Sequence, residues 1–242
     1  MEINPIIEVK NLSRKFGKFT AVDSISFKVF EGEIFGFLGA NGAGKTTAIK
    51  MLTGLLESSS GEATVAGFDI NKQKEQIKKQ IGYMSQKFSL YEDLTVYENI
   101  RFYAGIYGLK SNLIDKKIDE LLSGLDLSGV KNSLISSLPL GWRQKLAFMT
   151  AMVHNPRIVF LDEPTSGVDP VTRRQFWNMI YETAAAGCTI FVTTHYMDEA
   201  EYCDRISIMV SGRIEALGTP HELKSAYKCN SINDVFVKLA RN

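Results

Sequence analysis

Three short stretches of the chain carry the residue types that bind and cleave phosphate groups. The first is a glycine-rich loop that ends in a lysine and two threonines, and it comprises Gly39, Ala40, Asn41, Gly42, Ala43, Gly44, Lys45, Thr46 and Thr47. Glycines let backbone N–H groups surround an anion without side chains in the way. The lysine can reach the outer phosphates of a triphosphate, and the hydroxyl of Thr46 is the hard oxygen ligand that Mg²⁺ prefers.

The residues on either side of this loop predict the structure that it requires. Residues 34–38 are apolar and indicate a buried strand, while residues 48–52 place apolar side chains at helical spacing. Strand, glycine loop and helix define a phosphate-binding loop, because the helix N-terminus adds unpaired N–H groups and the positive end of a dipole. A turn that ends by chance in Lys-Thr is the alternative, and the three glycines and the correct flanks argue against it.

Two further apolar strands are predicted to end in polar side chains. Asp162 and Glu163 follow residues 158–161, and His195 follows residues 189–194. The carboxyl ends of parallel strands form ligand sites, so we expect these side chains to join the loop. Phosphoryl transfer to water needs a phosphate cradle, a metal ion and a group that orients the nucleophile. Asp162 is the candidate Mg²⁺ ligand, Glu163 the candidate base, and His195 a contact to the γ-phosphate or the water, although a lone histidine at a strand end is more often structural.

The remaining signals predict an α/β fold with a P-loop NTPase (RecA-like) core, an antiparallel β layer and an inserted helical subdomain. Strands at 6–9, 25–29 and 62–65 precede any long helix and indicate the antiparallel layer. From about 94 to 155 the periodicity is helical, with a capping box at Thr95 and Glu98 and a third helix from Trp142 to Val153. Farther on we expect a helix from Thr172, a hairpin turning at 211–212 and a helix capped by Thr219. The expected single domain has a catalytic core of residues 1–87 and 156–242 and a helical subdomain of residues 88–155.

Composition excludes several classes of protein. Lys and Arg number 28 against 27 Asp and Glu, and this net charge of +1 gives no electrostatic case for a nucleic-acid partner. No apolar run approaches the roughly 18 residues of a membrane span, and the N-terminus lacks the features of a signal peptide. Cys188, Cys203 and Cys229 show no metal spacing and indicate reduced thiols. We therefore expect a cytoplasmic chain that reaches a membrane only through partners.

The order of these motifs resembles that of the ATP-binding subunit of an ABC transporter over essentially the whole chain. Residues 162–170, Asp-Glu-Pro-Thr-Ser-Gly-Val-Asp-Pro, form a run that most other phosphate-loop NTPases lack. The resemblance identifies residues 39–47 as Walker A and residues 158–163 as Walker B with a catalytic glutamate. It implies ATP and Mg²⁺ as cofactors, and it makes Ser166 and Asp169 part of the D-loop at a dimer interface.

The same resemblance assigns three separate residues. Gln86 matches the Q-loop glutamine, which implies a contact to Mg²⁺ or its water and a link to the transmembrane partner. His195 matches the switch histidine. Phe16 falls where the family places its adenine-stacking aromatic residue, although the residues alone would favour a core position for this ring.

One motif departs from the family pattern. The family has Leu-Ser-Gly-Gly-Gln ahead of the third helix, and this chain has Leu138, Pro139, Leu140, Gly141 and Trp142. In the family this signature contacts the γ-phosphate held by the opposite subunit, and Pro139 offers neither a hydroxyl nor an N–H group. The helix N-terminus remains, and Arg143 and Gln144 are candidate replacement donors. The variant resembles ATP-binding subunits of bacterial multidrug-type exporters, so we expect a complete Walker face and a degenerate signature face.

The resemblance implies an ATP-hydrolysing subunit that powers transport. Two such domains, as a homodimer or a heterodimer, would enclose two Mg·ATP and dock on transmembrane permease subunits through a groove near Gln86 and residues 91–95. The runs at 91–95 and 233–236 resemble those of exporters and favour export. The alternative is an ABC-type ATPase acting on ribosomes or DNA, but we find no charged linker or coiled-coil insertion of that kind. A small-molecule kinase shares the phosphate loop and does not account for Gln86, Asp169 and His195.

Overall fold

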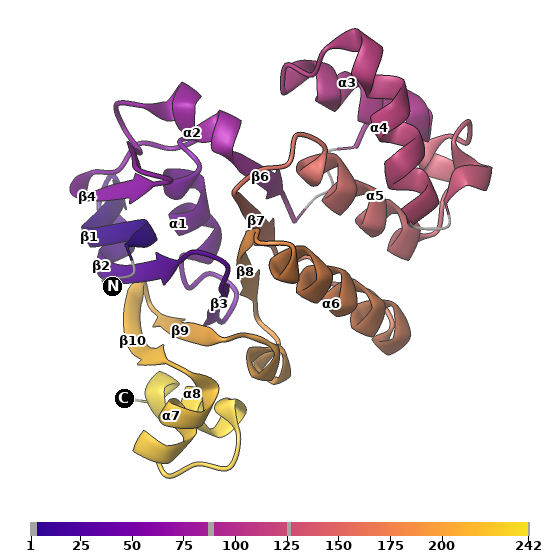
Figure 1. The fold of residues 1–242 in the computed structure, drawn as a ribbon. Coiled ribbons are helices and arrows are strands. Elements are labelled where there is room, and N and C mark those ends of the chain that lie inside the picture. The colour runs from indigo at the N-terminus through magenta and orange to yellow at the C-terminus, as the bar shows by residue number, and fades with distance from the viewer. Residues whose placement is uncertain (1–3, 87–89, 125–126, 242) are drawn as a thin grey trace.

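The computed structural model describes residues 4–86, 90–124 and 127–241, which form two β-sheets and the helices that cover them (Figure 1). A four-stranded antiparallel sheet has the order β2-β1-β4-β5. Its strands are β1 (Pro5–Phe16), β2 (Phe19–Phe30), β4 (Ser60–Val65) and β5 (Phe68–Asp69). The predicted antiparallel layer is confirmed. β1 and β2 are longer than predicted because they stay paired up to the hairpin end, where Phe16 lies opposite Phe19.

The second sheet has six strands in the order β10-β9-β3-β8-β7-β6, and it carries the site. Its members are β3 (Ile34–Gly39), β6 (Ile81–Met84), β7 (Ile158–Asp162), β8 (Thr189–Thr194), β9 (Arg205–Val210) and β10 (Arg213–Gly218). All neighbouring strands are parallel except the β9–β10 hairpin, which turns at residues 211–212 as predicted. Every residue of β3, β7 and β8 is buried, which is why these strands are nearly continuous apolar runs in the sequence.

An aromatic core joins the two sheets. The ring of Phe191 on β8 lies 5.2 to 6.1 Å, between centroids, from those of Phe27, Phe35, Phe37 and Phe160. Helix α1 (Lys45–Leu52) packs Ala48, Ile49, Met51 and Leu52 into the same core. This packing holds the start of α1, and with it the phosphate loop, rigidly against β3.

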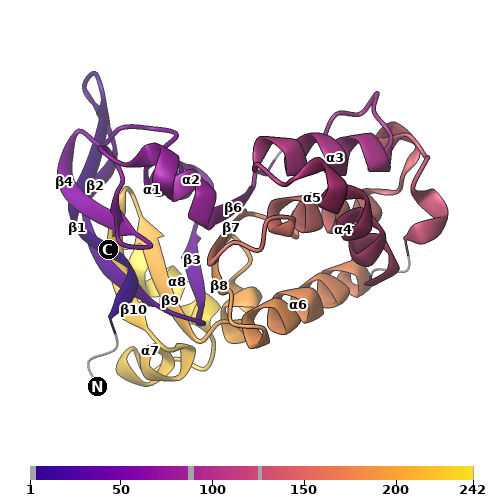
Figure 2. The same ribbon diagram turned by 45° about the horizontal axis from the view of Figure 1, so that its top comes forward.

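The helices between residues 96 and 152 lie to one side of the sheets, beyond β6 and β7 (Figure 2). They are α3 (Val96–Ile106), α4 (Ser111–Gly124) and α5 (Leu140–Met152), with the 3₁₀ turns η1 (Ser128–Val130) and η2 (Ile135–Ser137) between α4 and α5. The capping box of α3 is confirmed, with the backbone N–H of Thr95 donating to Glu98 Oε2 at 2.8 Å and that of Glu98 donating to Thr95 Oγ1 at 3.2 Å. Helix α2 (Lys74–Gln80) leads into β6.

Two helices begin earlier than predicted. Pro139 caps α5 with φ −55°, so Leu140, Gly141 and Trp142 form its first turn and the predicted start at Trp142 is wrong. α6 (Pro170–Ala185) begins two residues before Thr172, because the carboxylate of Asp169 accepts bonds from the backbone N–H groups of residues 171 and 172 and Pro170 suits the first helical position.

The C-terminal third completes the sheet's cover with η3 (Met197–Tyr202), α7 (Pro220–Ala226) and α8 (Ile232–Ala240). Thr219 and Glu222 form the predicted capping box of α7. The three cysteines are free thiols. Among the helices of the described part of the chain, none has the length and apolar character needed to cross a membrane.

Candidate nucleotide-binding and hydrolysis site

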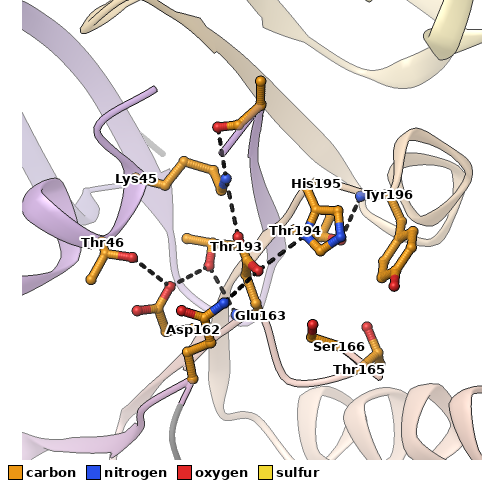
Figure 3. Close-up of polar contacts among 12 residues, drawn as sticks. Lys45, Thr46, Asp162, Glu163, Thr165, Ser166, Thr193, Thr194, His195 and Tyr196 are labelled. Carbon is orange, nitrogen blue, oxygen red and sulfur yellow. Dashed lines mark hydrogen bonds and ion pairs between the residues drawn. The ribbon is translucent and has the colours of Figure 1, made fainter. Parts of the chain in front are cut away.

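The order of the strands brings the three polar stretches together. β8 lies between β3 and β7 in the sheet, and all three run in the same direction. The phosphate loop after β3, the acid pair at the end of β7 and His195 after β8 therefore meet at one edge, as Figure 3 shows. The predicted convergence of Lys45, Asp162 and His195 is present in the structure.

The phosphate loop has the backbone conformation that only glycine adopts easily. Gly42 and Gly44 have φ of 81° and 110°, and a Cβ on Gly44 would lie 2.4 Å from the carbonyl oxygen of Ala21. Gly44 is the N-cap of α1, so the helix N-terminus opens directly onto the loop. The ammonium group of Lys45 folds back over the loop and donates to the carbonyl oxygens of Gly39 at 2.8 Å and Ala40 at 3.2 Å.

Glu163 is the centre of the site. Its Oε1 lies 3.2 Å from Lys45 Nζ, while its Oε2 accepts a bond from Gln86 Nε2 at 2.9 Å and lies 3.0 Å from His195 Nδ1 (Figure 3). The residue is 8% exposed, and its φ of 51° lies in the left-handed region, where a side chain is strained. Its backbone N–H donates to Thr193 Oγ1 at 3.0 Å, which holds this conformation. One carboxylate thus joins the phosphate loop, Gln86 and His195.

Asp162 forms a second, adjacent group with two threonines. Its Oδ1 accepts bonds from Thr193 Oγ1 at 2.8 Å and from Thr46 Oγ1 at 3.3 Å. Burial raises the pKa of this carboxyl above its usual range, and the two threonine hydroxyls act against that rise. Thr46 and Asp162 therefore place two hard oxygens side by side at the mouth of the loop.

This oxygen pair suits Mg²⁺ better than a metal that needs a complete protein cage. Mg²⁺ is commonly bound by one or two protein oxygens together with phosphate oxygens and water. In the described ranges, no group of three or more His, Cys, Asp or Glu residues could hold a metal ion. Gln86, the third candidate ligand, directs its amide nitrogen to Glu163 and not to the pair formed by Thr46 and Asp162.

A hollow of about 380 Å³ lies over the loop, and one of its walls is aromatic. It is lined by Phe19, Ala21, Asn41, Gly42, Gly44, Lys45, Thr46, Thr47, Gln86 and Glu163. The ring of Phe16 is not among them. It is 45% exposed, so a core position is wrong, and the guanidinium of Arg14 covers it at 4.6 Å. Phe19 was not predicted to line the site, and its only signal in the sequence is its place three residues after Phe16, at the start of β2.

The signature segment starts α5 and packs against the start of α6. A Cβ on Gly141 would lie 2.7 Å from Thr172 Cγ2, so any other residue there would require the Thr172 side chain to shift. Leu140 and Trp142 are each 39% exposed, whereas Leu138 is buried. Two apolar side chains of the segment, Leu140 and Trp142, therefore lie at the surface.

The two candidate replacement donors are engaged within the chain. Arg143 Nε donates to the carbonyl oxygen of Leu138 at 2.9 Å, and its Nη1 donates to Glu92 Oε1 at 3.2 Å. Gln144 is 1% exposed and donates to the carbonyl oxygen of Ser166 at 3.4 Å. The hypothesis that these side chains replace the signature serine is therefore not supported by their positions. They link the signature helix to residues 92 and 166 instead.

A phosphate loop at a helix N-terminus, with an acid pair and a histidine on neighbouring parallel strands, defines a P-loop α/β nucleotide-binding domain. The family model described as "ABC transporter" matches residues 22–166. The chain belongs to that family, as an ATP-binding domain with the fold and the ATPase character of its members.

Individual relatives agree with this assignment. Over 220 residues the chain is 49% identical to "Probable multidrug ABC transporter ATP-binding protein YbhF" of Escherichia coli, covering 91% of this chain and 38% of that protein. Over 221 residues it is 37% identical to "Linearmycin resistance ATP-binding protein LnrL" of Bacillus subtilis, covering 91% of this chain and 71% of that protein. A solved ATP-binding subunit of an ABC transporter superposes with a TM-score of 0.87 at 30% identity, covering 97% of this chain and 99% of the other. The chain thus spans well under half the length of YbhF.

Proposed function

We propose that this chain is the ATP-hydrolysing subunit of a membrane exporter, with Glu163 as the general base. The observation that carries the proposal is the position of the Glu163 carboxylate, which contacts Lys45, Gln86 and His195 at once. A carboxylate held in this way can accept a proton from water in line with a phosphate bound in the loop. The relatives YbhF and LnrL are named for multidrug transport and linearmycin resistance, and these names support export.

The other residues of the site have complementary roles in this proposal. The N–H groups of residues 39–47 and the ammonium group of Lys45 bind the β- and γ-phosphates. Thr46 and Asp162 would hold Mg²⁺, and the bound ion would neutralise negative charge on the phosphates. His195 and Gln86 fix the orientation of the Glu163 carboxylate, and Gln86 is the candidate link to the transmembrane partner. The family position of Phe16 keeps it a candidate for the adenine contact.

We also propose the division of the chain into a catalytic core of residues 1–87 and 156–242 and a helical subdomain of residues 88–155. Its support is the grouping of α3, α4 and α5 beyond β6 and β7 (Figure 2). Residues 87–89 and 125–126 lie outside the described residues. Ser166 and Asp169 precede α6, beside the signature, and we assign this surface to the second ATP-binding domain of a dimer.

The docking site for transmembrane permease subunits is predicted near Gln86 and residues 91–95. We propose the groove between α2 and α3 for it, although those residues do not line this groove. This groove of about 490 Å³ has apolar walls that include Leu55, Tyr103, Ile106 and Tyr107. Two of these side chains, Leu55 and Ile106, are 56% and 61% exposed. Through such partners the chain would lie on the cytoplasmic face of the membrane.

The test is the ATPase rate of the purified chain with Mg²⁺, measured against protein concentration. We expect the specific rate of phosphate release to rise with protein concentration, or phosphate release to appear when the membrane subunits are added. We expect no phosphate release from Glu163→Gln. Phosphate release by Glu163→Gln at the wild-type rate would refute the assigned base. Co-purification of nucleic acid in place of membrane subunits would refute transport.

A further inference from the structure

A second carboxylate, Glu199 in η3, is completely buried behind the site. Its exposure is 0%, and its Oε1 accepts a bond of 2.6 Å from the hydroxyl of Thr165, which is itself 1% exposed. Thr165 lies two residues after Glu163, and Glu199 lies four residues after His195. The buried bond therefore ties the loop that follows β7 to the loop that follows β8.

Arg173 of α6 extends this connection toward His195. Its Nε lies 3.7 Å from Glu199 Oε1, and its guanidinium carbon lies 4.2 Å from the centroid of the Tyr196 ring. The Tyr196 ring lies in turn 4.2 Å, between centroids, from the imidazole of His195 at an angle of 36°. Contacts thus run from Glu199 through Arg173 and Tyr196 to the histidine of the site.

These contacts orient the plane of the His195 ring, which the hydrogen bond to Glu163 does not. That bond holds one atom of the imidazole, Nδ1, at 3.0 Å from the carboxylate, and leaves the plane of the ring to be set by its packing. Figure 3 shows the Tyr196 ring beside His195, on the side away from Glu163. A cation over an aromatic ring is attracted to the face of the ring, so Arg173 favours this position of the Tyr196 ring.

The guanidinium of Arg173 is held by charge and stacking more than by hydrogen bonds. Arg173 Nε and Glu199 Oε2 are buried atoms for which the described residues provide no hydrogen-bond partner. A second ion pair, to Asp198 Oδ2, has a distance of 3.6 Å. The guanidinium therefore depends on Glu199 for its charge partner in the interior and on Tyr196 for its stacking surface.

We propose that Tyr196 and Arg173 are positioning residues, which hold the imidazole of His195 against Glu163, and that the Thr165–Glu199 bond anchors them to the loop that carries the general base. The consequence for hydrolysis rests on the proposed function, whereas the positioning of the ring does not.

The first test reads the ring of His195 directly. The chain has three histidines, so the ring signals in a ¹H–¹³C NMR spectrum can be assigned with His195→Gln. We expect Tyr196→Leu and Arg173→Leu both to shift the His195 signals, because the first removes the neighbouring ring and the second removes its support. Arg174→Leu, on the exposed side of the same helix, is the matched control. Unchanged His195 signals in Arg173→Leu would overturn the proposal.

The second test is the ATPase reaction itself. We expect Arg173→Leu and Tyr196→Leu to lower kcat about tenfold to a hundredfold at nearly unchanged KM for ATP, because misplacing a group in the site costs rate without removing a binding contact. Tyr196→Phe keeps the ring and should keep most of the rate. In a His195→Ala background, Arg173→Leu should cause no further loss, since residues that act through one group are not additive. A full additional loss in that background would overturn the proposal.

A second variant covers the case in which Arg173→Leu does not fold. Arg173→Leu leaves the Glu199 carboxylate buried without a cation, so Arg173→Leu combined with Glu199→Gln serves if the single variant does not fold, with the same expected shift of the His195 signals. Absence of phosphate release by the wild-type chain with its membrane partner would refute the proposed function, and the NMR result would still decide the positioning.

Discussion

The ammonium group of Lys45 lies 3.2 Å from the Glu163 carboxylate, and the two side chains are only 4% and 7% exposed. The residue that we assign to the phosphates and the residue that we assign to the water are therefore a buried ion pair. Burying either charge alone is costly, so each side chain depends on the other. This pair makes the phosphate loop and the acid strand β7 a single unit, although 118 positions separate the two residues (163 minus 45).

Replacing the general base should separate hydrolysis from binding. Glu163→Gln keeps the size of the side chain and one acceptor oxygen but cannot take a proton. We expect ATP hydrolysis to fall about a hundredfold or more, with ATP affinity within a few fold of the wild type, because general base catalysis contributes about 10²–10⁴ in rate. Phosphate release and equilibrium ATP binding measure the two quantities. Glu182→Gln, on the exposed face of α6, is the control and should hydrolyse ATP normally.

The buried pair should also be visible in the free energy of unfolding. Lys45→Met leaves the Glu163 carboxylate without its cation, and we expect a loss of about 3 kcal/mol. Adding Glu163→Gln removes the unpaired charge and should restore most of that loss. Urea unfolding of the two single variants and the double variant gives the coupling free energy.

An exposed ion pair provides the matched comparison for this experiment. Lys74 lies 2.7 Å from Glu57, and these side chains are 29% and 70% exposed. Lys74→Met should cost no more than about 1 kcal/mol, since solvent screens such a pair. Equal costs for Lys45→Met and Lys74→Met would contradict our account of the buried pair.

Acid should destabilise the chain through His154. Burial lowers the pKa of this imidazole below its ordinary value, and the ring is stacked on Tyr107 with centroids 3.8 Å apart while Nε2 lies 3.0 Å from the carbonyl oxygen of Ile81. Because the pKa is depressed in the folded state, the contribution of His154 to the free energy of unfolding is complete above the unfolded pKa of about 6.5. It is lost as the pH falls through the lower folded value.

The measurement is the free energy of unfolding between about pH 7.5 and pH 5. His154→Phe keeps an aromatic ring on Tyr107 and cannot be protonated, so its unfolding free energy should fall less over this range than that of the wild type. Contributions from other titrating groups are common to both proteins and cancel in the difference. His221→Gln, at an exposed position, should follow the wild type. The same slope in His154→Phe and wild type would exclude this histidine as the source.

Restoring the signature should raise ATP turnover. Pro139→Ser supplies a hydroxyl at the N-cap of α5, where Pro139 provides no side-chain bond, and Leu140→Gly removes an exposed apolar side chain. We expect the double variant to hydrolyse ATP several-fold faster in the homodimer at equal ATP affinity. No increase would mean that the variant signature is fully competent. Gly141→Ala is a contrasting change that should lower the rate, because its methyl group meets Thr172.

Local signals allowed much of the chain to be predicted before its structure. The capping boxes at Thr95 and Thr219 and the hairpin at residues 211–212 depend on neighbours within a few positions, and each is present. The phosphate loop is equally local, since its glycines and the start of α1 are contiguous. The early starts of α5 and α6 come from Pro139 and Asp169, whose cap geometry decides the first helical residue.

The pairs that make the site depend on contacts between distant residues, which only the tertiary structure decides. β8 lies between β3 and β7, and this order turns Glu163 into a common partner of Lys45 and His195. The positive φ of Glu163 has no signal in its residue type, because neighbouring strands impose it. Phe16 is covered by Arg14 and Phe19 lines the hollow, a distinction that the two identical residue types do not signal. The sequence by itself predicted that Lys45, Asp162 and His195 converge at the ends of parallel strands, whereas packing decided which atoms meet, since strand order and side-chain contacts depend on the whole core.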